Sequence, residues 1–412
     1  MVSALCCIGL IMSKHIPPDF QVSGFLTASI SAGIKKNQEK DFALIYSEVP
    51  AAAAGVFTTN RVKAAPVLLS IERIRSGSAQ AVLVNSGCAN ACTGRRGLLD
   101  ARRLSRLVAS SLKVNPKSVL LASTGVIGRP LPMPAMEKNL PLLVDALSSK
   151  GLGEAAQAIM TTDTFPKAVI TRSRVNGQEI TIAGIAKGAG MINPKMATLL
   201  SFVLTDAAIA PQALRKSLQE GAQGSFNRVT VDGDTSTNDT LLILANGQAR
   251  NRRIVRHTSG HKKFSDLLHG LLFSLAKMIV RDGEGATKLV EIAVERARSI
   301  SEAERVARTV ADSPLVKTAF FGEDANWGRI LCVLGYCGAK VDPDRIDLFF
   351  DKAPIVTKGV GVGGRSEKRA SQILKKNSFK VTIDLHQGKD QFSVLTTDLS
   401  IDYVKINASY RS

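Results

Sequence analysis

Short apolar runs and longer stretches of mixed polarity follow one another along the chain and predict its secondary structure. The runs that predict buried strands are Phe42–Ser47, Ala81–Val84, Val119–Ser123 and Thr198–Leu204. Helices are expected at Leu98–Leu112, Gly153–Met160, Pro211–Glu220, Phe264–Ile279 and Lys368–Lys376, most clearly where apolar residues recur with a helical period. Strands and helices that alternate in this way are compatible with an α/β fold.

The run that begins at Thr198 follows an unusual segment, KGAGMINPKMA, which ends at Ala197. Two glycine-bearing turns and a proline lead through small residues into a strand whose first residue carries a hydroxyl. This pattern suits a chain that cleaves itself between Ala197 and Thr198. A freed Thr198 would carry its own general base, because an α-amine has a pKa near ~8 and lies within reach of the side-chain oxygen. An ordinary glycine-rich loop that enters a core strand is the alternative.

The length and composition bound the class of protein. At 412 residues the chain exceeds a typical single core, so two or more packed units are expected. Hydrophobic residues at 45% and charged residues at 22% are typical of a soluble globular protein, and no apolar run reaches the ~20 residues that span a bilayer. Residues 1–23 are treated as a leader of doubtful relevance, and residues 1–12 are excluded from the fold argument. The apolar segment 1–12 is either a poor signal-like segment or an over-extended start; translation from Met12 is favoured, because the segment is short and no basic segment precedes it. A cytoplasmic protein with no membrane partner is expected.

The net charge of +19 raises the alternative of a nucleic-acid-binding protein. The densest basic stretch, Arg250–Lys263, follows Asn-Gly and is expected to be an exposed loop. Aromatic residues make up only 5% of the chain, which argues against a stacking platform for single strands. No helix-turn-helix, zinc-finger or RNA-recognition signature is present, so a basic surface that attracts small acidic substrates is favoured and no nucleic-acid partner is expected.

The six cysteines show no C-x-x-C spacing and no paired histidine, so no zinc site is expected. Catalysis by Cys88 or Cys92 is disfavoured because no histidine is placed to activate either thiol. The polar stretch Ser225–Thr240 lacks the spacing of a calcium loop. The sequence therefore predicts no metal and reduced, mostly buried thiols.

Several residues have the types that acyl transfer requires. Thr124 and Gly125 end a predicted strand, where a hydroxyl and a backbone N–H could stabilise an oxyanion. Lys187 could neutralise a substrate carboxylate, and Glu284, exposed between two glycines, could hold a substrate ammonium. The hydroxyl cluster that starts at Thr161 could bind a substrate amide or carboxylate. Ordinary turns, a surface lysine and a turn carboxylate are the respective alternatives.

A dinucleotide-binding motif is the rival pattern. Gly359–Gly364 contains G-x-G-x-x-G, and Asp384 lies at about the spacing of a ribose-binding acid. The preceding segment 351–358 contains a proline and charges and is a poor candidate for a buried strand. A flexible glycine loop is therefore favoured.

Several segments, in order and with matching spacing from about Gly24 onward, resemble the ornithine acetyltransferase (glutamate N-acetyltransferase) family. They are PAAAAGVFTTNRVKAAPV, NSGCANACTG, KGAGMINPKMATLLSF, DGDTSTND, DGEGATK, DSPLVKTAFFGEDANWGRI and DLSIDYVKINASYRS. Cys88 stands where the family usually has Asn, and the terminal Ser412 stands where it has Thr.

This resemblance implies a self-processing N-terminal-threonine acyltransferase fold with stacked mixed β-sheets flanked by helices. Cleavage would give an α chain, 24–197, and a β chain, 198–412, that form αβ units in a hetero-oligomer. The implied reaction moves acetyl from N2-acetylornithine to glutamate through an acetyl-Thr198 ester, in arginine biosynthesis. No cofactor is implied, and acetyl-CoA stays open as a co-substrate because some family members accept it.

The resemblance also implies roles for particular residues. Thr198 is the nucleophile, and Thr124 and Gly125 form the oxyanion hole. The residues that it implies bind substrate are Thr161, Lys187, Thr198, Glu284, Asn407 and Ser412.

Two alternatives stay open. A related self-processing threonine aminopeptidase or amidase would release product to water instead of to glutamate. A basic nucleic-acid-binding protein is the alternative from another class.

Overall fold

The computed structural model describes residues 16–17, 19–36, 38–193 and 199–409. Within them the chain divides into two compact units. Unit 1 contains the described residues up to Asn227 together with Asp234–Ile279, and unit 2 contains Arg228–Gly233 and the described residues from Val280. This division agrees with the expectation of more than one packed unit. Neither unit boundary falls at the predicted cleavage point, because unit 1 includes chain on both sides of it.

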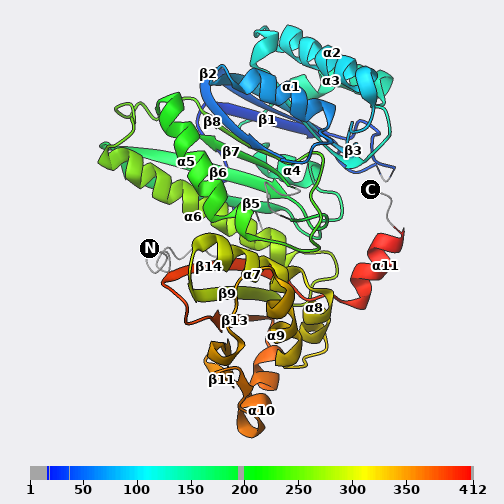
Figure 1. The fold of residues 1–412 in the computed structure, drawn as a ribbon. Coiled ribbons are helices and arrows are strands. Elements are labelled where there is room, and N and C mark those ends of the chain that lie inside the picture. Colours follow the sequence, from blue (N-terminus) through cyan, green and yellow to red (C-terminus); the bar gives the residue numbers. More distant parts are fainter. Residues whose placement is uncertain (1–15, 18, 37, 194–198, 410–412) are drawn as a thin grey trace. The chain divides into compact units, whose positions relative to one another are not determined.

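Unit 1 is built on an eight-stranded mixed sheet with the order β4-β3-β2-β8-β7-β6-β5, to which β1 adds by pairing with β2 (Figure 1). The pairs β3–β4 and β7–β8 are parallel, and the other pairs are antiparallel. The strands are β1 Phe25–Ile30, β2 Phe42–Phe57, β3 Ser78–Cys88, β4 Val119–Val126, β5 Lys167–Val175, β6 Gln178–Lys187, β7 Leu200–Thr205 and β8 Thr240–Ala245.

Helices cover both faces of this sheet, which explains why its strands are continuous apolar runs instead of alternating ones. Phe42 and Leu44 pack in one apolar cluster with α2 and α3, whereas Ala43 and Ile45 pack in another cluster with α4. All four side chains are buried. The helices of this unit are α1 Ala65–Ile74, α2 Gly94–Leu112, α3 Met133–Asp145, α4 Leu152–Ala158, α5 Pro211–Gly224 and α6 Ser259–Arg281, with short 3-10 turns at Pro116–Ser118 and Phe226–Arg228. The last residues of α6 and of the second turn belong to unit 2.

Unit 2 has a six-stranded sheet with the order β12-β11-β10-β13-β9-β14, in which only β13 and β9 run parallel among the described strands. The insert Arg228–Gly233 joins this unit through a bridge between Val229 and Leu395. The elements are β9 Leu289–Ala297, α7 Ile300–Asp312, α8 Pro314–Phe321, α9 Trp327–Tyr336, a 3-10 turn Pro343–Arg345, β10 Asp347–Phe350, β11 Ala353–Thr357, β12 Val360–Gly361, α10 Gly364–Leu374, β13 Ser378–Asp384, β14 Asp390–Thr397 and α11 Ile401–Ser409.

The predicted α/β class is confirmed, since each unit pairs a mixed sheet with helices. The five predicted helices correspond to α2, α4, α5, α6 and α10, with ends that differ by a few residues. The predicted strand at 42–47 is too short, because β2 continues through Pro50 to Phe57. Its pairing with β3 shifts register between Tyr46 and Ala51, and this irregularity accommodates the proline.

Two further predictions are wrong. The segment 351–358 does form a strand, β11, whose Ile355 and Val356 are buried. β11 pairs antiparallel with β10 and β12, so the glycine motif closes a hairpin and does not follow a parallel strand of the dinucleotide-binding type. The basic stretch is not wholly a loop, because from Ser259 it is the first turn of α6.

Candidate active site

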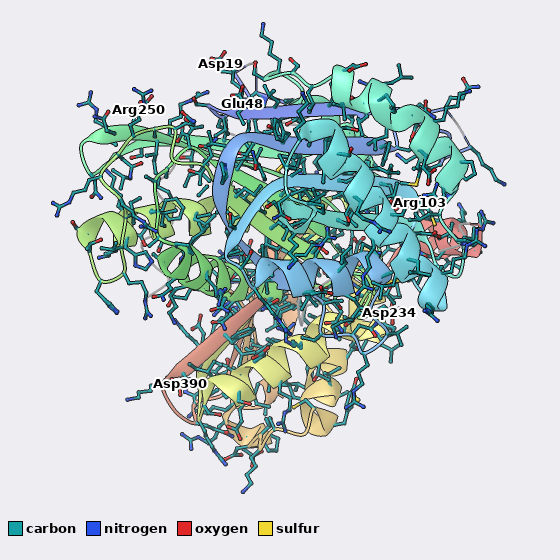
Figure 2. The ribbon with its side chains drawn as sticks, turned by 90° about the horizontal axis from the view of Figure 1, so that it is seen from above. Asp19, Glu48, Arg103, Asp234, Arg250 and Asp390 are labelled. Carbon is teal, nitrogen blue, oxygen red and sulfur yellow. The ribbon has the colours of Figure 1, made fainter. Side chains whose placement is uncertain are left out.

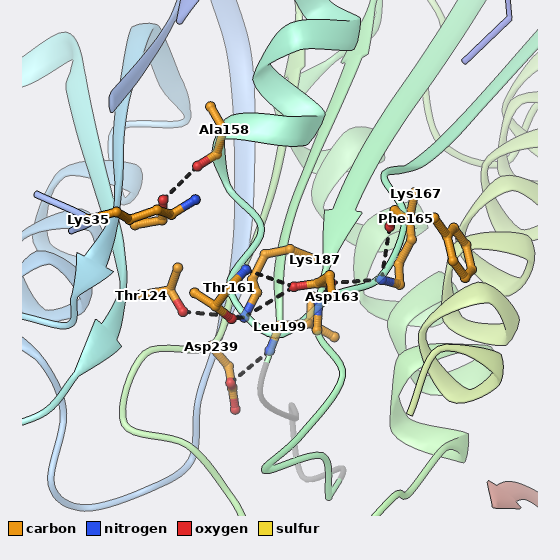
Figure 3. Close-up of polar contacts among 12 residues, drawn as sticks. Lys35, Thr124, Ala158, Thr161, Asp163, Phe165, Lys167, Lys187, Leu199 and Asp239 are labelled. Atoms are coloured by element: carbon orange, nitrogen blue, oxygen red, sulfur yellow. Dashed lines mark hydrogen bonds and ion pairs between the residues drawn. The ribbon is translucent and has the colours of Figure 1, made fainter. Parts of the chain in front are cut away.

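Lys187 is the centre of a polar cluster in unit 1. It is the last residue of β6, and its side chain is buried. Its ammonium donates to Thr161 Oγ1 at 2.7 Å and contacts Thr124 Oγ1 at 3.4 Å (Figure 3). The structure therefore brings together three residues that the sequence singled out separately, and Lys187 is not the surface lysine of the alternative interpretation.

A buried carboxylate supports this cluster. Asp163 accepts from Lys167 Nζ at 2.7 Å and from the backbone N–H of Gly188 at 2.6 Å, while its second oxygen accepts from Thr161 N and lies 3.9 Å from Lys187 Nζ (Figure 3). Burial by itself raises the pKa of Asp163, but the two ammonium groups and the Gly188 N–H outweigh burial and hold this pKa well below its usual value. The carboxylate is therefore ionised and fixes both Thr161 and Lys187.

Gly125 sits where the ends of β3 and β4 approach each other closely. Its φ is +124°, and a Cβ at this position would lie 2.3 Å from the carbonyl carbon of Gly87 and 2.6 Å from the nitrogen of Cys88. Only glycine fits such a contact with backbone atoms. The neighbouring Thr124 is buried and Gly125 is partly exposed, so the predicted oxyanion pair lies at a tight strand end next to Lys187.

The predicted cleavage point lies in the connection between β6 and β7, which are neighbours in the sheet. β6 and β7 pair antiparallel with Leu200 opposite Lys187, so the start of β7 lies beside the polar cluster. Leu199 is buried, and its N–H donates to Asp239 Oδ1 at 3.0 Å (Figure 3). Ala197 and Thr198 themselves lie outside the described residues.

The two other described candidates lie in unit 2. Asn407, on α11, donates to Glu284 Oε2 at 2.9 Å. Glu284 is half-buried and not fully exposed. The first turn of α11 packs closely on the next residue, Gly285, where a Cβ would lie 2.5 Å from the backbone nitrogen of Tyr403. The predicted substrate-binding residue Ser412 lies outside the described residues.

Cys88 is a poor candidate for a reactive thiol. Cys88 is buried, and burial raises its pKa, which disfavours the thiolate that catalysis would need. Cys337 is also buried, but Cys92 and Cys332 are exposed, so the expectation of mostly buried thiols holds for only half of the four cysteines that the structure describes. Within the described ranges, no group of three or more Cys, His, Asp or Glu side chains could hold a metal ion.

The basic stretch forms a separate surface. Arg250, Arg252 and Arg253 are exposed, and Figure 2 shows Arg250 on the outside of the molecule. Residues of this stretch and of α5 and α6 line a depression of about 460 Å³ that includes Arg256, His261 and His269. None of the residues of the Lys187 cluster lines it. Among the described helices, none is long and apolar enough to cross a membrane.

Sequence reasoning assigned no role to two acids of this site, Asp163 and Asp239. A signal for Asp163 was Lys167 four residues later, a spacing that permits a local ion pair. A signal for Asp239 was its position directly before the mainly apolar run 240–245, because an acid that begins a buried strand is itself close to the core.

Comparisons with known proteins identify the family. Residues 26–412 match the model of the ArgJ family. The arginine biosynthesis bifunctional protein ArgJ of Geobacter sulfurreducens is 55% identical over 391 residues, which cover 95% of this chain and 100% of that protein. The protein of the same name from Syntrophotalea carbinolica is 53% identical over 392 residues, with 95% and 100% covered.

Solved structures give two further similarities. The crystal structure of the arginine biosynthesis bifunctional protein ArgJ from Bacillus halodurans is 40% identical, covers 51% of this chain and 98% of its own, and has a TM-score of 0.49. Ornithine acetyltransferase from Mycobacterium tuberculosis, complexed with ornithine, is 37% identical, covers 45% of this chain and 99% of its own, and has a TM-score of 0.38. The family match and the two full-length relatives together establish that the chain belongs to the ArgJ family.

Proposed function

We propose that this chain is a glutamate N-acetyltransferase that transfers acetyl from N2-acetylornithine to glutamate after cleaving itself between Ala197 and Thr198. Family membership over residues 26–412 supports the activity, and it favours neither a threonine amidase nor a nucleic-acid-binding protein. The observation that carries the local mechanism is the register of β6 and β7. This register sets Leu200, two residues after Thr198, opposite Lys187, which contacts both Thr161 and Thr124.

The first stage is an acyl shift followed by hydrolysis. Thr198 Oγ attacks the Ala197 carbonyl carbon, the bond from that carbon to the Thr198 nitrogen breaks, and the hydroxyl proton ends on the nitrogen. Water then hydrolyses the ester, which leaves a carboxylate on Ala197 and a free α-amine on Thr198. The amine is the base of the second stage.

In the second stage Thr198 Oγ attacks the acetyl carbon of N2-acetylornithine. Thr124 and the Gly125 N–H stabilise the oxyanion, and the proton that leaves the hydroxyl passes through the amine to the departing nitrogen of ornithine. Glutamate then takes the acetyl group from the Thr198 ester, which gives ping-pong kinetics.

Substrate groups are assigned by charge. Lys187 and Thr161 hold a substrate carboxylate, because a buried ammonium and a hydroxyl converge there. On the family resemblance, Glu284 and Asn407 are also assigned to substrate binding, Glu284 to a substrate ammonium. Within unit 2 the two side chains are joined by a hydrogen bond from Asn407 to Glu284. Ser412 is assigned to the same binding set on the family resemblance alone.

The two products of cleavage stay associated as an αβ unit. In the sheet of unit 1, β7 and β8 come from the C-terminal product and lie between β2 and β6, which come from the N-terminal product. Separation would break the backbone hydrogen bonds of both the β2–β8 and the β6–β7 pairs. We propose that such units associate further, act in the cytoplasm and need no metal or nucleotide cofactor, with acetyl-CoA open as a co-substrate.

An intact-mass spectrum of the purified wild type beside Thr198→Ala and Thr198→Ser tests the proposal. We expect two products in the wild type, the second beginning at Thr198, and one uncut chain in Thr198→Ala. Thr198→Ser keeps the hydroxyl and should also cleave. A wild type that stays uncut after prolonged incubation would remove the mechanism.

A second assay separates the activities. The cleaved protein is incubated with N2-acetylornithine, with and without glutamate, and N-acetylglutamate and acetate are quantified. Transfer predicts N-acetylglutamate that depends on glutamate, whereas an amidase would release acetate at the same rate in both reactions.

A further inference from the structure

Asp239 is a buried acid to which the family resemblance assigns no role. It directly precedes β8 and is 1% exposed. Its Oδ1 accepts from Leu199 N–H at 3.0 Å, while its Oδ2 is inaccessible to solvent and has no hydrogen-bond partner among the residues that the structure describes. A buried carboxyl oxygen without a hydrogen-bond partner is destabilising, so its presence requires an explanation.

Covalent geometry connects this oxygen to the cleavage point. Leu199 directly follows Thr198, so three bonds of about 1.33, 1.52 and 1.46 Å separate the Leu199 nitrogen from the Thr198 nitrogen. The two nitrogens are therefore within about 4 Å of each other for any torsion angles. Cleavage turns the Thr198 nitrogen into an amine with additional N–H donors. This amine is close to the Asp239 carboxyl, whose Oδ2 accepts no hydrogen bond from the described residues.

The electrostatic surroundings make this carboxyl unusual. Burial raises the pKa of Asp239 well above its ordinary value, and the Leu199 N–H, the Lys187 ammonium and the Thr58 side chain only partly oppose that effect. Lys187, on β6, is the charged group among the described residues whose field acts on Asp239. β7 and β8 carry no ionisable residue. Thr58, after β2, donates its backbone N–H to the Asp239 carbonyl, and its hydroxyl, which lies near the Asp239 side chain, donates to the Ser236 carbonyl at 2.7 Å. No Asp or Glu on β7 or β8 would therefore compete with Asp239 for an ammonium group at the start of β7.

We propose that Asp239 is a positioning residue for the reactions of Thr198: it holds the chain through the Leu199 amide and pairs with the α-amine that cleavage frees. This inference rests on the proposed function. Before cleavage the carboxyl fixes the start of β7. After cleavage its second oxygen takes a hydrogen bond from the amine, and the proton is shared between the two groups. Asp239 thereby sets the orientation and the proton affinity of the base that acyl transfer uses.

The test compares Asp239→Asn with a matched control, Asp206→Asn. Asp206 follows the opposite end of β7, is also buried, and accepts a backbone hydrogen bond from Thr181 N at 2.7 Å; burial raises its pKa as well. Both substitutions thus remove a buried acid that holds a backbone N–H beside the same strand, but only one of them is next to Thr198.

Two quantities are measured: the half-time of self-cleavage by intact mass, and the pH profile of kcat/KM for acetyl transfer by the cleaved protein. For Asp239→Asn we expect cleavage about tenfold slower or more. The acid limb of the pH profile should move down by about 1–3 pH units, because the amine loses a neighbouring carboxylate. Asp206→Asn should leave both quantities at the wild-type values. A purely structural role for Asp239 would lower the rate without moving the pH limb.

The outcomes separate this inference from the proposed function. A wild type that does not cleave refutes the proposed function itself. A wild type that cleaves, beside an Asp239→Asn variant with unchanged half-time and pH profile, refutes only the role of Asp239. Equal effects in Asp239→Asn and Asp206→Asn also overturn it. Circular dichroism and the urea midpoint monitor folding, and Asp239→Ser, with a smaller side chain, replaces Asp239→Asn if that variant does not fold.

Discussion

The ion-pair cluster around Asp163 yields a prediction whose size follows from the structure. Asp163→Asn keeps the shape of the side chain and removes its charge. The side chains of Asp163 and Lys167 are fully buried, and that of Lys187 is 6% exposed. The substitution therefore leaves two buried ammonium groups without their shared counter-ion. Breaking a buried pair in this way costs about 3–5 kcal/mol, because the remaining charge is not resolvated.

The assay is urea unfolding followed by circular dichroism. With an m-value of about 3 kcal/mol/M, the midpoint of the Asp163→Asn variant should fall by about 1–1.7 M. Trp327, the single tryptophan, lies in unit 2, so its fluorescence reports that unit separately and tests whether the two units unfold in one transition. Lys167→Met is the matched variant, and it should cost less because Asp163 keeps Lys187 and two backbone N–H donors.

The pH dependence supplies a second check with a definite sign. The folded-state pKa of Asp163 is depressed, so its contribution to stability is fully present above the unfolded pKa of about 3.9 and is lost as the pH falls through the folded value. Wild type and Asp163→Asn should therefore differ most above about pH 4 and converge in stronger acid. An unchanged urea midpoint at pH 7 would refute the argument that this carboxylate stabilises the cluster.

Further substitutions test other parts of the structure. Gly125→Ala should lower kcat for acetyl transfer by about 100-fold or more, because its Cβ would collide with the backbone of β3. Gly128→Ala is the control: Gly128 has φ +80° and no atom lies within 4 Å of an added Cβ, so kcat should stay within about tenfold of wild type. Equal losses in the two variants would contradict the close-approach argument. Cys88→Ala should keep transfer within about twofold, and a large loss at unchanged stability would restore a catalytic thiol. Burial lowers the pKa of Lys317 to about 8, so the unfolded state binds more protons than the folded state between pH 8 and 10.5. The free energy of unfolding should therefore rise over that range by up to about 3 kcal/mol. Urea titrations should show this rise in the wild type and not in Lys317→Met.

Local patterns in the sequence are sufficient for much of the secondary structure. The helical spacing in α6 and the short apolar runs of β3, β4 and β7 identify these elements, because periodicity depends only on near neighbours. The ordered set of motifs also identifies the family, which the comparison over residues 26–412 confirms. Local patterns fail where partner strands decide the outcome. β2 continues past Pro50 because β8 pairs with its second half, and β11 forms because β10 and β12 flank it.

The sequence by itself determined which residue types are available for chemistry, and the tertiary structure decided which of them meet. Lys187 and Thr124 are 63 positions apart, and Leu199 and Asp239 are 40 apart. Sheet order and strand register bring each pair together, and these depend on long-range pairing that no local pattern specifies. Burial is decided at the same level: Asp163 and Asp239 are buried acids, and their pKa values shift in opposite directions because of the atoms packed around them.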